Sequence, residues 1–268
     1  MHVYVINLAR SPERRDHITA ELDRAGVDYE VVTGVEGRDL DLADTATIDP
    51  ALLTRGQPWP AGMAGCALSH LRVYRKILND GHEQAVVLED DVTVPPDLAS
   101  LAEAVGRHLT GAEVALLNYD SREACLMSRE GAVRLPGARQ LVLPIDVRQP
   151  GSSAGYVVTR EACERMDKSM LPVRASPDDW WFFYREGILD RVRCVVPLPV
   201  RKSPEFDSTI GIYSLKPGLK ARLVGSLLRF NVPLLRQAIS YRRERIHRQW
   251  TRSELVDVSF TERPSRLD

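Results

Sequence analysis

The sequence is poor in features that mark several classes of protein. Only four of its 268 residues are cysteine, and no two of them stand at the CxxC or CxxxC spacing of a zinc-binding pair. No stretch approaches the run of about 18 apolar residues that a membrane-spanning helix needs. The net charge is only −1, which argues against wholesale binding to nucleic acid. We therefore expect free thiols in a reducing compartment, no zinc site, no membrane span and no nucleic-acid partner.

What remains is an ordinary globular composition. The hydrophobic share of 44% and the charged share of 27% suit one large domain or two small ones. The chain begins directly with a strand-like run at residues 3–6, without the basic and apolar regions of a signal peptide. The expected location is therefore cytoplasmic.

One stretch combines an apolar run with three acids. Residues 85–88 are apolar and lead into Glu89, Asp90 and Asp91. Such a run is typical of a central parallel strand, and open α/β sheets bind ligands at the carboxyl ends of their strands. Three adjacent carboxylates repel one another, so a hard divalent cation is expected nearby; a solvated acidic turn is the alternative. Alternation along an extended chain places Glu89 and Asp91 on one side and Asp90 on the other.

The N-terminal part is typical of a parallel sheet. Residues 3–8 and 28–32 have the pattern of buried strands, and residues 11–26 between them have the start and stop signals of a helix. This order is the basic unit of a parallel α/β sheet. Arg14 and Arg15 lie in the first helical turn, where cations oppose the helix dipole. They suit a site that binds an anion such as pyrophosphate, or they are ordinary solvated arginines.

The rest of the first 214 residues continues the alternation. Residues 64–78, which include Ser69 and His70, and residues 98–109 have helical periodicity. A lone histidine on a helix is more often a packing or surface residue than a catalyst. The secondary-structure elements within residues 121–151 are expected to be short and irregular. Strands are expected at residues 114–117, 141–147, 156–158 and 192–196.

A second acidic motif stands at a helix start. Asp178 and Asp179 precede five aromatic residues, 180–184. Acids at a helix N-terminus are favoured by the helix dipole. Five consecutive aromatics cannot all face one core, so some are expected in the core and some along a pocket. A carboxylate beside the two tryptophans of this run can have a raised pKa through desolvation, as a general base requires.

The composition changes after residue 214. Residues 216–252 contain ten lysines and arginines against one acid, with leucines at helical spacing. We expect residues 1–214 to form the catalytic domain and residues 215–268 a basic, helical extension. Such a segment can lie on an anionic membrane surface, and a peripheral position at the inner membrane face follows. The alternatives are a helix packed on the catalytic domain, an oligomer contact or an RNA-binding tail.

In combination, the motifs resemble glycosyltransferase family 25, which includes lipooligosaccharide and collagen galactosyltransferases. The resemblance covers roughly residues 1–212, and its motifs run in family order. The matching segments are residues 4–8 with Arg14 and Arg15, then 62–70, 87–92, 154–158 and 177–180. The resemblance implies an α/β, GT-A-type Rossmann-like fold with a mostly parallel central sheet. It also implies inverting transfer of a hexose, often galactose, from a UDP-sugar, with Mn²⁺ or Mg²⁺ as cofactor.

Site residues follow from these motif matches. The resemblance implies a metal held by Glu89 and Asp91, the family's counterpart of a DxD motif. In our interpretation Asp179 is the first candidate for the base that takes the acceptor proton, and Asp178 is the second. The residues expected to bind the nucleotide sugar are Asn7, Leu8, Arg10, Arg14, Thr33, Ser69, His70, Glu89, Asp90 and Gly155.

Two other functions use the same features. A metal-dependent phosphohydrolase of nucleotide sugars would employ the same acids, with water as acceptor. A non-catalytic nucleotide-sugar-binding protein, recruited to a membrane by its basic tail, would need no catalytic base. The acceptor of the transferase, expected to be a glycan, a glycolipid or a small molecule, is not identified by these residues.

Overall fold

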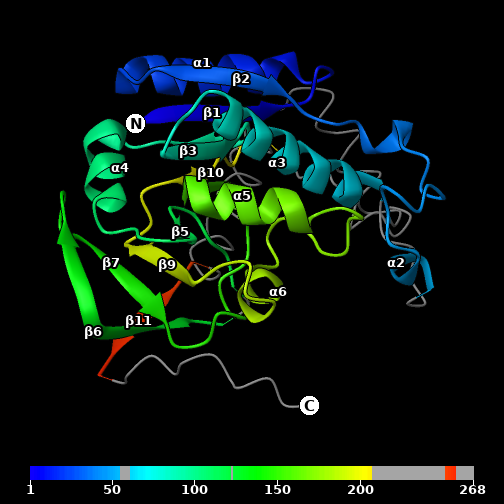
Figure 1. Cartoon of the computed structure of the whole chain (residues 1–268). Coiled ribbons are helices and arrows are strands. Elements are labelled where there is room, and N and C mark those ends of the chain that lie inside the picture. Colours follow the sequence, from blue (N-terminus) through cyan, green and yellow to red (C-terminus); the bar gives the residue numbers. More distant parts are fainter. Residues whose placement is uncertain (55–60, 122, 207–250, 258–268) are drawn as a thin grey trace, which may run out of the picture.

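The computed structural model describes residues 1–54, 61–121, 123–206 and 251–257, and these form a three-layer α/β domain (Figure 1). Its main sheet has nine strands in the order β11-β6-β7-β9-β5-β8-β3-β1-β2. The strands are β1 (His2–Asn7), β2 (Tyr29–Thr33), β3 (Gln84–Glu89), β5 (Glu113–Leu116), β6 (Cys125–Leu135), β7 (Arg139–Pro144), β8 (Gly155–Thr159), β9 (Arg191–Val196) and β11 (Ser253–Val256). A small second sheet pairs β4 (Val92–Thr93) with β10 (Arg201–Lys202).

The central sheet is mostly parallel, as predicted. Only β7 and β8 run against the direction of the other strands in the described part of the sheet. The strand β8 lies between β3 and β5 and is antiparallel to both. Its first residues therefore lie beside the last residues of β3. This placement matters because β3 leads into the acidic triplet.

Helices cover both faces of the sheet. They are α1 (Pro12–Ala25), α2 (Pro50–Thr54), α3 (Ala61–Asn79), α4 (Leu98–Gly106), α5 (Arg160–Ser169) and α6 (Trp180–Arg185), with a 3-10 turn at Gly37–Asp39. Side chains alternate along each strand, so β1 sends Tyr4 into the core under α3 and α5, and Val3 and Val5 into the core under α1 and α4. Residues buried on both faces explain the continuous apolar runs of β1 and β3.

The predicted ends of α1 agree with the structure, whereas α3 begins three residues before and α4 ends three residues before the predicted positions. Helix α1 begins with Pro12 and ends at Gly26, whose φ of 63° is in the left-handed region that glycine adopts without strain. The hydroxyl of Thr159 accepts a hydrogen bond from the backbone N–H of Ala162 at 3.3 Å and so caps α5. These ends are set by local sequence, which is why they could be predicted.

The prediction of short, irregular structure at residues 121–151 is wrong. This region contains the eleven-residue strand β6, which pairs with β7 across a register shift between Ser128 and Val133. Gly131, with a φ of 69°, lies within the shift. The bulge interrupts the period-two pattern of apolar residues by which a strand is identified in a sequence.

The C-terminal extension lies mostly outside the described residues, so its membrane role stays a prediction. Of residues 215–268 the structure describes 251–257, and within them Ser253–Val256 form β11 rather than a helix. This strand pairs with β6 at the edge of the main sheet. Part of the segment assigned to the extension therefore belongs to the main sheet. No helix among the described residues is long and apolar enough to span a bilayer.

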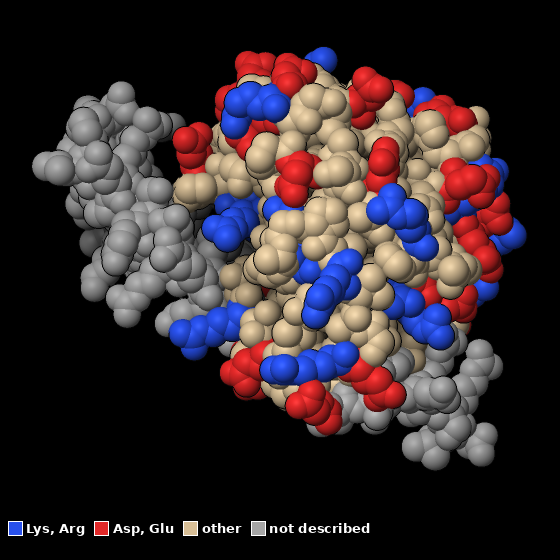
Figure 2. Space-filling model, turned by 90° about the vertical axis from the view of Figure 1, so that its left-hand side faces the viewer, with Lys and Arg blue, Asp and Glu red and all other residues tan. Residues whose placement is uncertain are grey.

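The described surface carries both signs of charge. Figure 2 shows one face of the molecule on which lysines and arginines are interspersed with acids.

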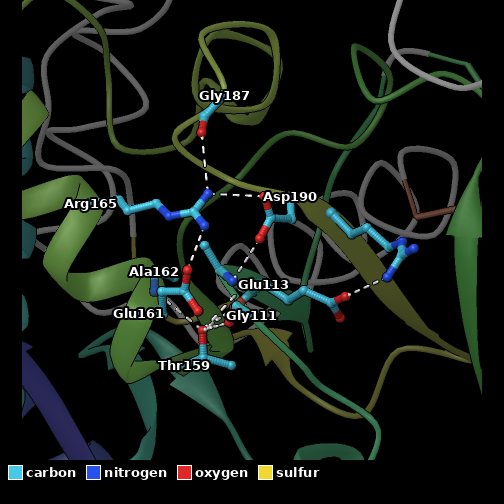
Figure 3. A network of polar contacts seen from close by, with 10 residues as sticks. Gly111, Glu113, Thr159, Glu161, Ala162, Arg165, Gly187 and Asp190 are labelled. Atoms are coloured by element: carbon cyan, nitrogen blue, oxygen red, sulfur yellow. Dashed lines mark hydrogen bonds and ion pairs between the residues drawn. The ribbon is translucent and has the colours of Figure 1, made fainter.

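A polar network joins α5 to the strands beneath it (Figure 3). The Thr159 hydroxyl donates to the carbonyl of Gly111 at 2.7 Å and accepts from the backbone N–H of Glu113 at 3.2 Å. The Glu113 carboxylate is fully buried and accepts hydrogen bonds from Arg191 at 3.0 Å and from Arg193 at 2.7 Å. A buried carboxylate needs such partners because its desolvation is costly.

We expect Glu113→Gln to destabilise the fold, because an amide replaces a buried carboxylate that two arginines contact. The expected loss is about 1–3 kcal/mol of unfolding free energy, the range for an unsatisfied buried polar group. Chemical denaturation of the purified chain would measure it. The matched control is Glu161→Gln, which alters a solvent-exposed pair with Arg165 and should cost under about 1 kcal/mol. Equal stability of the two variants would contradict the role given to Glu113.

Candidate functional site

The acidic triplet lies at the carboxyl end of β3, where the strand gives way to a turn. Glu89 is the last strand residue, and Asp90 and Asp91 form the turn before β4. Glu89 faces α3 and Asp90 faces α1, as alternation predicts. Asp91 departs from the predicted alternation: it shares a partner, Arg14, with Asp90, because the extended conformation ends at Glu89.

Arg14 is the main cationic partner of the triplet. Its Nη1 donates to Asp90 Oδ1 at 2.8 Å and its Nη2 donates to Asp91 Oδ2 at 3.1 Å, while only 8% of the arginine side chain is exposed. Asn7 Nδ2 donates to Asp90 Oδ2 at 2.7 Å and to the Ser11 carbonyl at 3.0 Å. The end of β1 and the first turn of α1 thus hold Asp90 and Asp91 in place. The arginine that the sequence suggested for an external anion also neutralises the protein's own carboxylates.

Glu89 has a different set of neighbours on the α3 side. Its Oε1 accepts a hydrogen bond from the Ser153 hydroxyl at 2.8 Å and lies 3.6 Å from His70 Nε2. Burial alone would raise the pKa of Glu89, but its interactions with His70, Lys202 and the Ser153 hydroxyl together lower it to about 2. Glu89 is therefore an ionised carboxylate in this site.

Asp91 is the least compensated of the three acids. Burial and then the charge of Glu89 raise the pKa of Asp91 to about 6, against the opposing effect of Arg14. Burial likewise raises the pKa of Asp90. Asp91 Oδ1 is buried and has no hydrogen-bond partner within the described structure. An unpartnered buried carboxylate oxygen is the atom that a bound cation would satisfy.

Lys202, which the sequence did not indicate, completes the charged centre. Strand β10 pairs with β4 immediately after the triplet and places Lys202 opposite Val92. Its Nζ donates to Asp120 Oδ2 at 3.0 Å, and although burial opposes it, the charges of Asp120, Glu89 and Asp91 raise the pKa of Lys202. Nothing in the sequence near Lys202 marks it, because 111 positions separate it from Asp91 and only strand pairing unites them.

Two cavities adjoin this charged centre, one through Lys202 and the other through Glu89 and Asp90. The larger, of about 640 Å³, is lined by Asn118, Asp120, Lys202 and Thr93 among others, and this volume is typical of small-molecule sites. The smaller, of about 80 Å³, lies between β1, α1 and α3. Its lining includes these residues predicted to bind the nucleotide sugar: Leu8, Arg10, Arg14, Ser69, His70, Glu89 and Asp90.

Two of these residues are held by protein contacts. Ser69 accepts a hydrogen bond from the backbone N–H of Val35 at 2.8 Å and donates to the carbonyl of Gly65 at 2.6 Å. Arg10 is ion-paired with Glu36. Ser69 therefore fastens the loop after β2 to α3, and Arg10 borders the cavity with more than a third of its side chain exposed.

Three other predicted residues do not line the small cavity: Asn7, which bonds Asp90, and Thr33 and Gly155. Thr33 is exposed at the end of β2, and its carbonyl accepts a hydrogen bond from Arg72 at 2.6 Å. Gly155 opens β8 beside β3; a Cβ at this position would lie 3.2 Å from Leu88 Cδ2. Gly155 thus allows β8 to approach the end of β3, whereas the structure gives no contact of Thr33 with the site.

The two acids near residue 180 have different surroundings. Asp179 is exposed and caps α6, since its Oδ1 accepts a hydrogen bond from the N–H of Phe182 at 3.0 Å. Asp178 is half-buried, and its charge contributes to the raised pKa of Cys66, which burial and Glu89 chiefly raise. Asp178 is therefore within electrostatic reach of the acidic centre.

The aromatic run after these acids is largely core. Trp180, Phe183 and Tyr184 are buried under the sheet, and the Trp180 indole donates to the Ser152 carbonyl at 3.1 Å. Trp181 and Phe182 are half-buried and lie within 6 Å of the guanidinium groups of Arg148 and Arg174. Trp180 consequently supports the segment that carries Ser153 to Glu89.

Close backbone approaches shape the small cavity. A Cβ at Gly65 of α3 would lie 2.6 Å from the Val35 carbonyl oxygen and 2.7 Å from the Gly37 nitrogen. A Cβ at Gly37 would lie 2.0 Å from the Ala61 carbonyl oxygen. The loop after β2 can rest on α3 only because both positions lack a side chain.

Comparison with known proteins gives a family match over most of this domain. The profile described as "Glycosyltransferase family 25 (LPS biosynthesis protein)" matches residues 1–181. A bovine (Bos taurus) protein named "Probable inactive glycosyltransferase 25 family member 3" is 35% identical over 96 residues, 34% of this chain and 16% of that protein. Human (Homo sapiens) "Procollagen galactosyltransferase 2" is 28% identical over 96 residues, 34% of this chain and 15% of that protein. The matched part thus spans about a sixth of the length of these relatives.

Among solved structures, one similar chain is a glycosyltransferase involved in the glycosylation of the major capsid of PBCV-1. The sequence identity is 11%, and the match covers 72% of this chain and 80% of that chain. The TM-score is 0.33.

We expect Gly65→Ala to destabilise the domain, because the new methyl group would meet backbone atoms that cannot rotate away. Overpacking of this kind costs about 1–3 kcal/mol, and about 2–4 °C of melting temperature accompanies each kcal/mol in a domain of this size. Thermal unfolding would measure the change. Gly151→Ala is the matched control, since its Cβ would lie 3.5 Å from the nearest atom, the Asp120 carbonyl oxygen. A Gly65→Ala melting temperature as high as that of Gly151→Ala would refute the close contact.

Proposed function

Because this chain belongs to glycosyltransferase family 25, we propose that it transfers a hexose from a UDP-sugar to a hydroxyl group of a glycan or glycolipid, inverting the anomeric carbon. Galactose is the first candidate sugar, since one relative is named as a galactosyltransferase. The observation that carries the proposal is the charged centre at the end of β3, where Arg14 and Lys202 accompany three carboxylates and Lys202 also lines a cavity of about 640 Å³. A nucleotide sugar would bring a diphosphate to these cations.

A divalent cation fits the Asp91 side of this centre. The donors there are carboxylate oxygens, which suit Mn²⁺ or Mg²⁺, and Asp91 Oδ1 has no other partner in the described structure. Asp91 and Glu89 would hold the ion, which would supply Lewis-acid stabilisation of the departing diphosphate. Arg14 holds Asp90 and Asp91 in position for this role, and Lys202 adds a positive charge near the leaving group.

We assign the acceptor base to Asp178 in preference to Asp179. An inverting displacement needs one group that takes the proton of the attacking hydroxyl. The Asp179 carboxylate is engaged as the cap of α6, whereas Asp178 is half-buried and near enough to Cys66 that its charge helps to raise the pKa of that thiol. Asp178 is therefore the better placed of the two sequence candidates.

The same residues are compatible with two alternative functions. A nucleotide-sugar phosphohydrolase would release UDP with water as the only acceptor. The second alternative is a non-catalytic binding protein, which is supported by the relative that is named as probably inactive. A screen of UDP-sugars separates the three: transfer predicts UDP release that an acceptor glycan stimulates, hydrolysis predicts release that acceptors leave unchanged, and binding alone predicts none.

The metal assignment predicts that Asp91→Asn lowers Mn²⁺-dependent UDP release from UDP-galactose by about 10²–10³-fold, as expected when one stabilising group of a transition state is removed. Its circular-dichroism spectrum should stay that of the unchanged chain. Asp97→Asn is the matched control, because Asp97 pairs with Arg139 away from both cavities and should keep full activity. Full activity of the unchanged chain in EDTA would show that Arg14 and Lys202 suffice without a metal.

The base assignment predicts opposite effects for two neighbouring substitutions. Asp178→Asn should reduce acceptor-stimulated UDP release by about 10²–10⁴-fold and leave UDP-galactose binding, measured by calorimetry, nearly unchanged. Asp179→Asn should keep the activity, since an asparagine can still cap a helix, and lose at most about 1 kcal/mol of stability. If Asp179→Asn alone abolished transfer, the exposed cap would be the base and the assignment would be wrong.

A further inference from the structure

A second cluster of ligand-type side chains lies on the α3 side of Glu89. The Cys66 sulfur, a ring nitrogen of His70 and a carboxylate oxygen of Glu89 all lie within 4.8 Å of one another. Cys66 and His70 are four positions apart on α3, so they share one face of the helix. Glu89 reaches this face from the end of β3. Sulfur, imidazole nitrogen and carboxylate oxygen are together the donor types of a zinc site.

The His70 ring is the observation that points to a ligand. His70 is fully buried, yet its Nε2 has no hydrogen-bond partner in the described structure. The nearest acidic oxygen, Glu89 Oε1, is 3.6 Å away, beyond hydrogen-bond length. Two ligands bound to one tetrahedral zinc ion at about 2.1 Å each stand about 3.4 Å apart. The separation of His70 and Glu89 thus suits a shared ion better than a hydrogen bond.

Surrounding contacts orient these ligands. His70 Nδ1 lies 2.7 Å from the Tyr156 hydroxyl, which lies 2.8 Å from the Tyr74 hydroxyl. A metal at Nε2 requires the tautomer with the proton on Nδ1, and the Tyr156 hydroxyl is placed to accept a hydrogen bond from that N–H. The Ser153 hydroxyl in turn donates to Glu89 Oε1 at 2.8 Å. Such outer contacts are typical of metal sites, where they fix the direction of the ligand.

We propose that Cys66, His70 and Glu89 bind one Zn²⁺ ion, with a fourth coordination position open to the small cavity that all three line. The cavity of about 80 Å³ has room for the ion and a water molecule, whose share of liquid volume is about 30 Å³. The mixed donor set favours zinc over Mn²⁺ or Mg²⁺, which prefer oxygen ligands. Binding removes the thiol proton of Cys66, which passes to solvent.

This site shares one ligand, Glu89, with the site assigned to Asp91, and it does not depend on glycosyl transfer. The other two zinc ligands come from α3, and Asp91 takes no part. Zinc would link α3 to the end of β3. We expected no zinc site because the sequence has no closely spaced cysteine pair. That argument applies only to sites built from two neighbouring cysteines.

Cobalt titration of the full chain tests the proposal. Metal would first be removed with a chelator, and Co²⁺ added as a spectroscopic substitute for zinc. We expect a thiolate-to-cobalt charge-transfer absorption that saturates at one ion per chain and is lost when Zn²⁺ displaces cobalt. Absence of the charge-transfer absorption from the unchanged chain would overturn the proposal.

Matched variants identify the ligands. Cys66→Ser should abolish the charge-transfer absorption, and Cys66→Ser and His70→Gln should each weaken zinc binding, measured by calorimetry, by at least about 10-fold. Cys125→Ser, a buried cysteine in β6, and Asp91→Asn should bind zinc as the unchanged chain does. Circular dichroism would confirm that each variant is folded. Unchanged zinc affinity in folded Cys66→Ser, or affinity lost in Asp91→Asn, would place the ion elsewhere and refute the site.

Discussion

Glu89, Asp90 and Asp91 repel one another, and the surrounding residues compensate their negative charges. Three carboxylates at the end of a buried strand cannot remain charged without compensation. Asp90 and Asp91 share the buried guanidinium of Arg14, while Glu89 is turned toward α3 and the charge of Lys202. The compensation is incomplete, since Asp91 Oδ1 and His70 Nε2 lack partners in the described structure. Incomplete compensation of this kind is typical of sites that bind ligands.

The direction of β8 decides which residues meet at this centre. If β8 ran parallel to β3, the first residues of β8 would lie beside the first residues of β3, far from the acidic triplet. Because it is antiparallel, Ser153 comes close enough to bond Glu89, and Trp180 fastens the same segment through Ser152. The small sheet of β4 and β10 brings Lys202 to the same centre, although it is distant from the triplet along the chain. Segments distant in the chain thereby form one charged centre.

Glu89 and Asp91 give the end of one strand two different chemistries. On the Asp91 side, oxygen donors lie near Arg14 and Lys202, and Lys202 also lines the larger cavity, an arrangement suited to a diphosphate and a hard cation. On the Glu89 side, sulfur and imidazole from α3 meet the carboxylate in a smaller cavity. Alternation at the end of β3 turns Glu89 and Asp90 to opposite faces of the sheet, and Glu89 is common to the two arrangements.

The sequence by itself determined the features that depend on near neighbours in the chain. Strands β1 and β3, the ends of α1 and the cap of α5 follow from apolar runs, Pro12, Gly26 and Thr159, whose effects act within a few residues. The acidic triplet, the family and most of the residues lining the small cavity were also readable, because each motif is short and contiguous.

Only the tertiary structure decided which of these residues work together. The strand β6 escaped prediction because a bulge breaks its pattern, and β11 because a short edge strand has little pattern of its own. The separate roles of Asp178 and Asp179, the part of Lys202 and the meeting of Cys66 with Glu89 depend on contacts across the sheet. Such contacts arise when distant segments pack, and residue spacing along the chain carries no information about them.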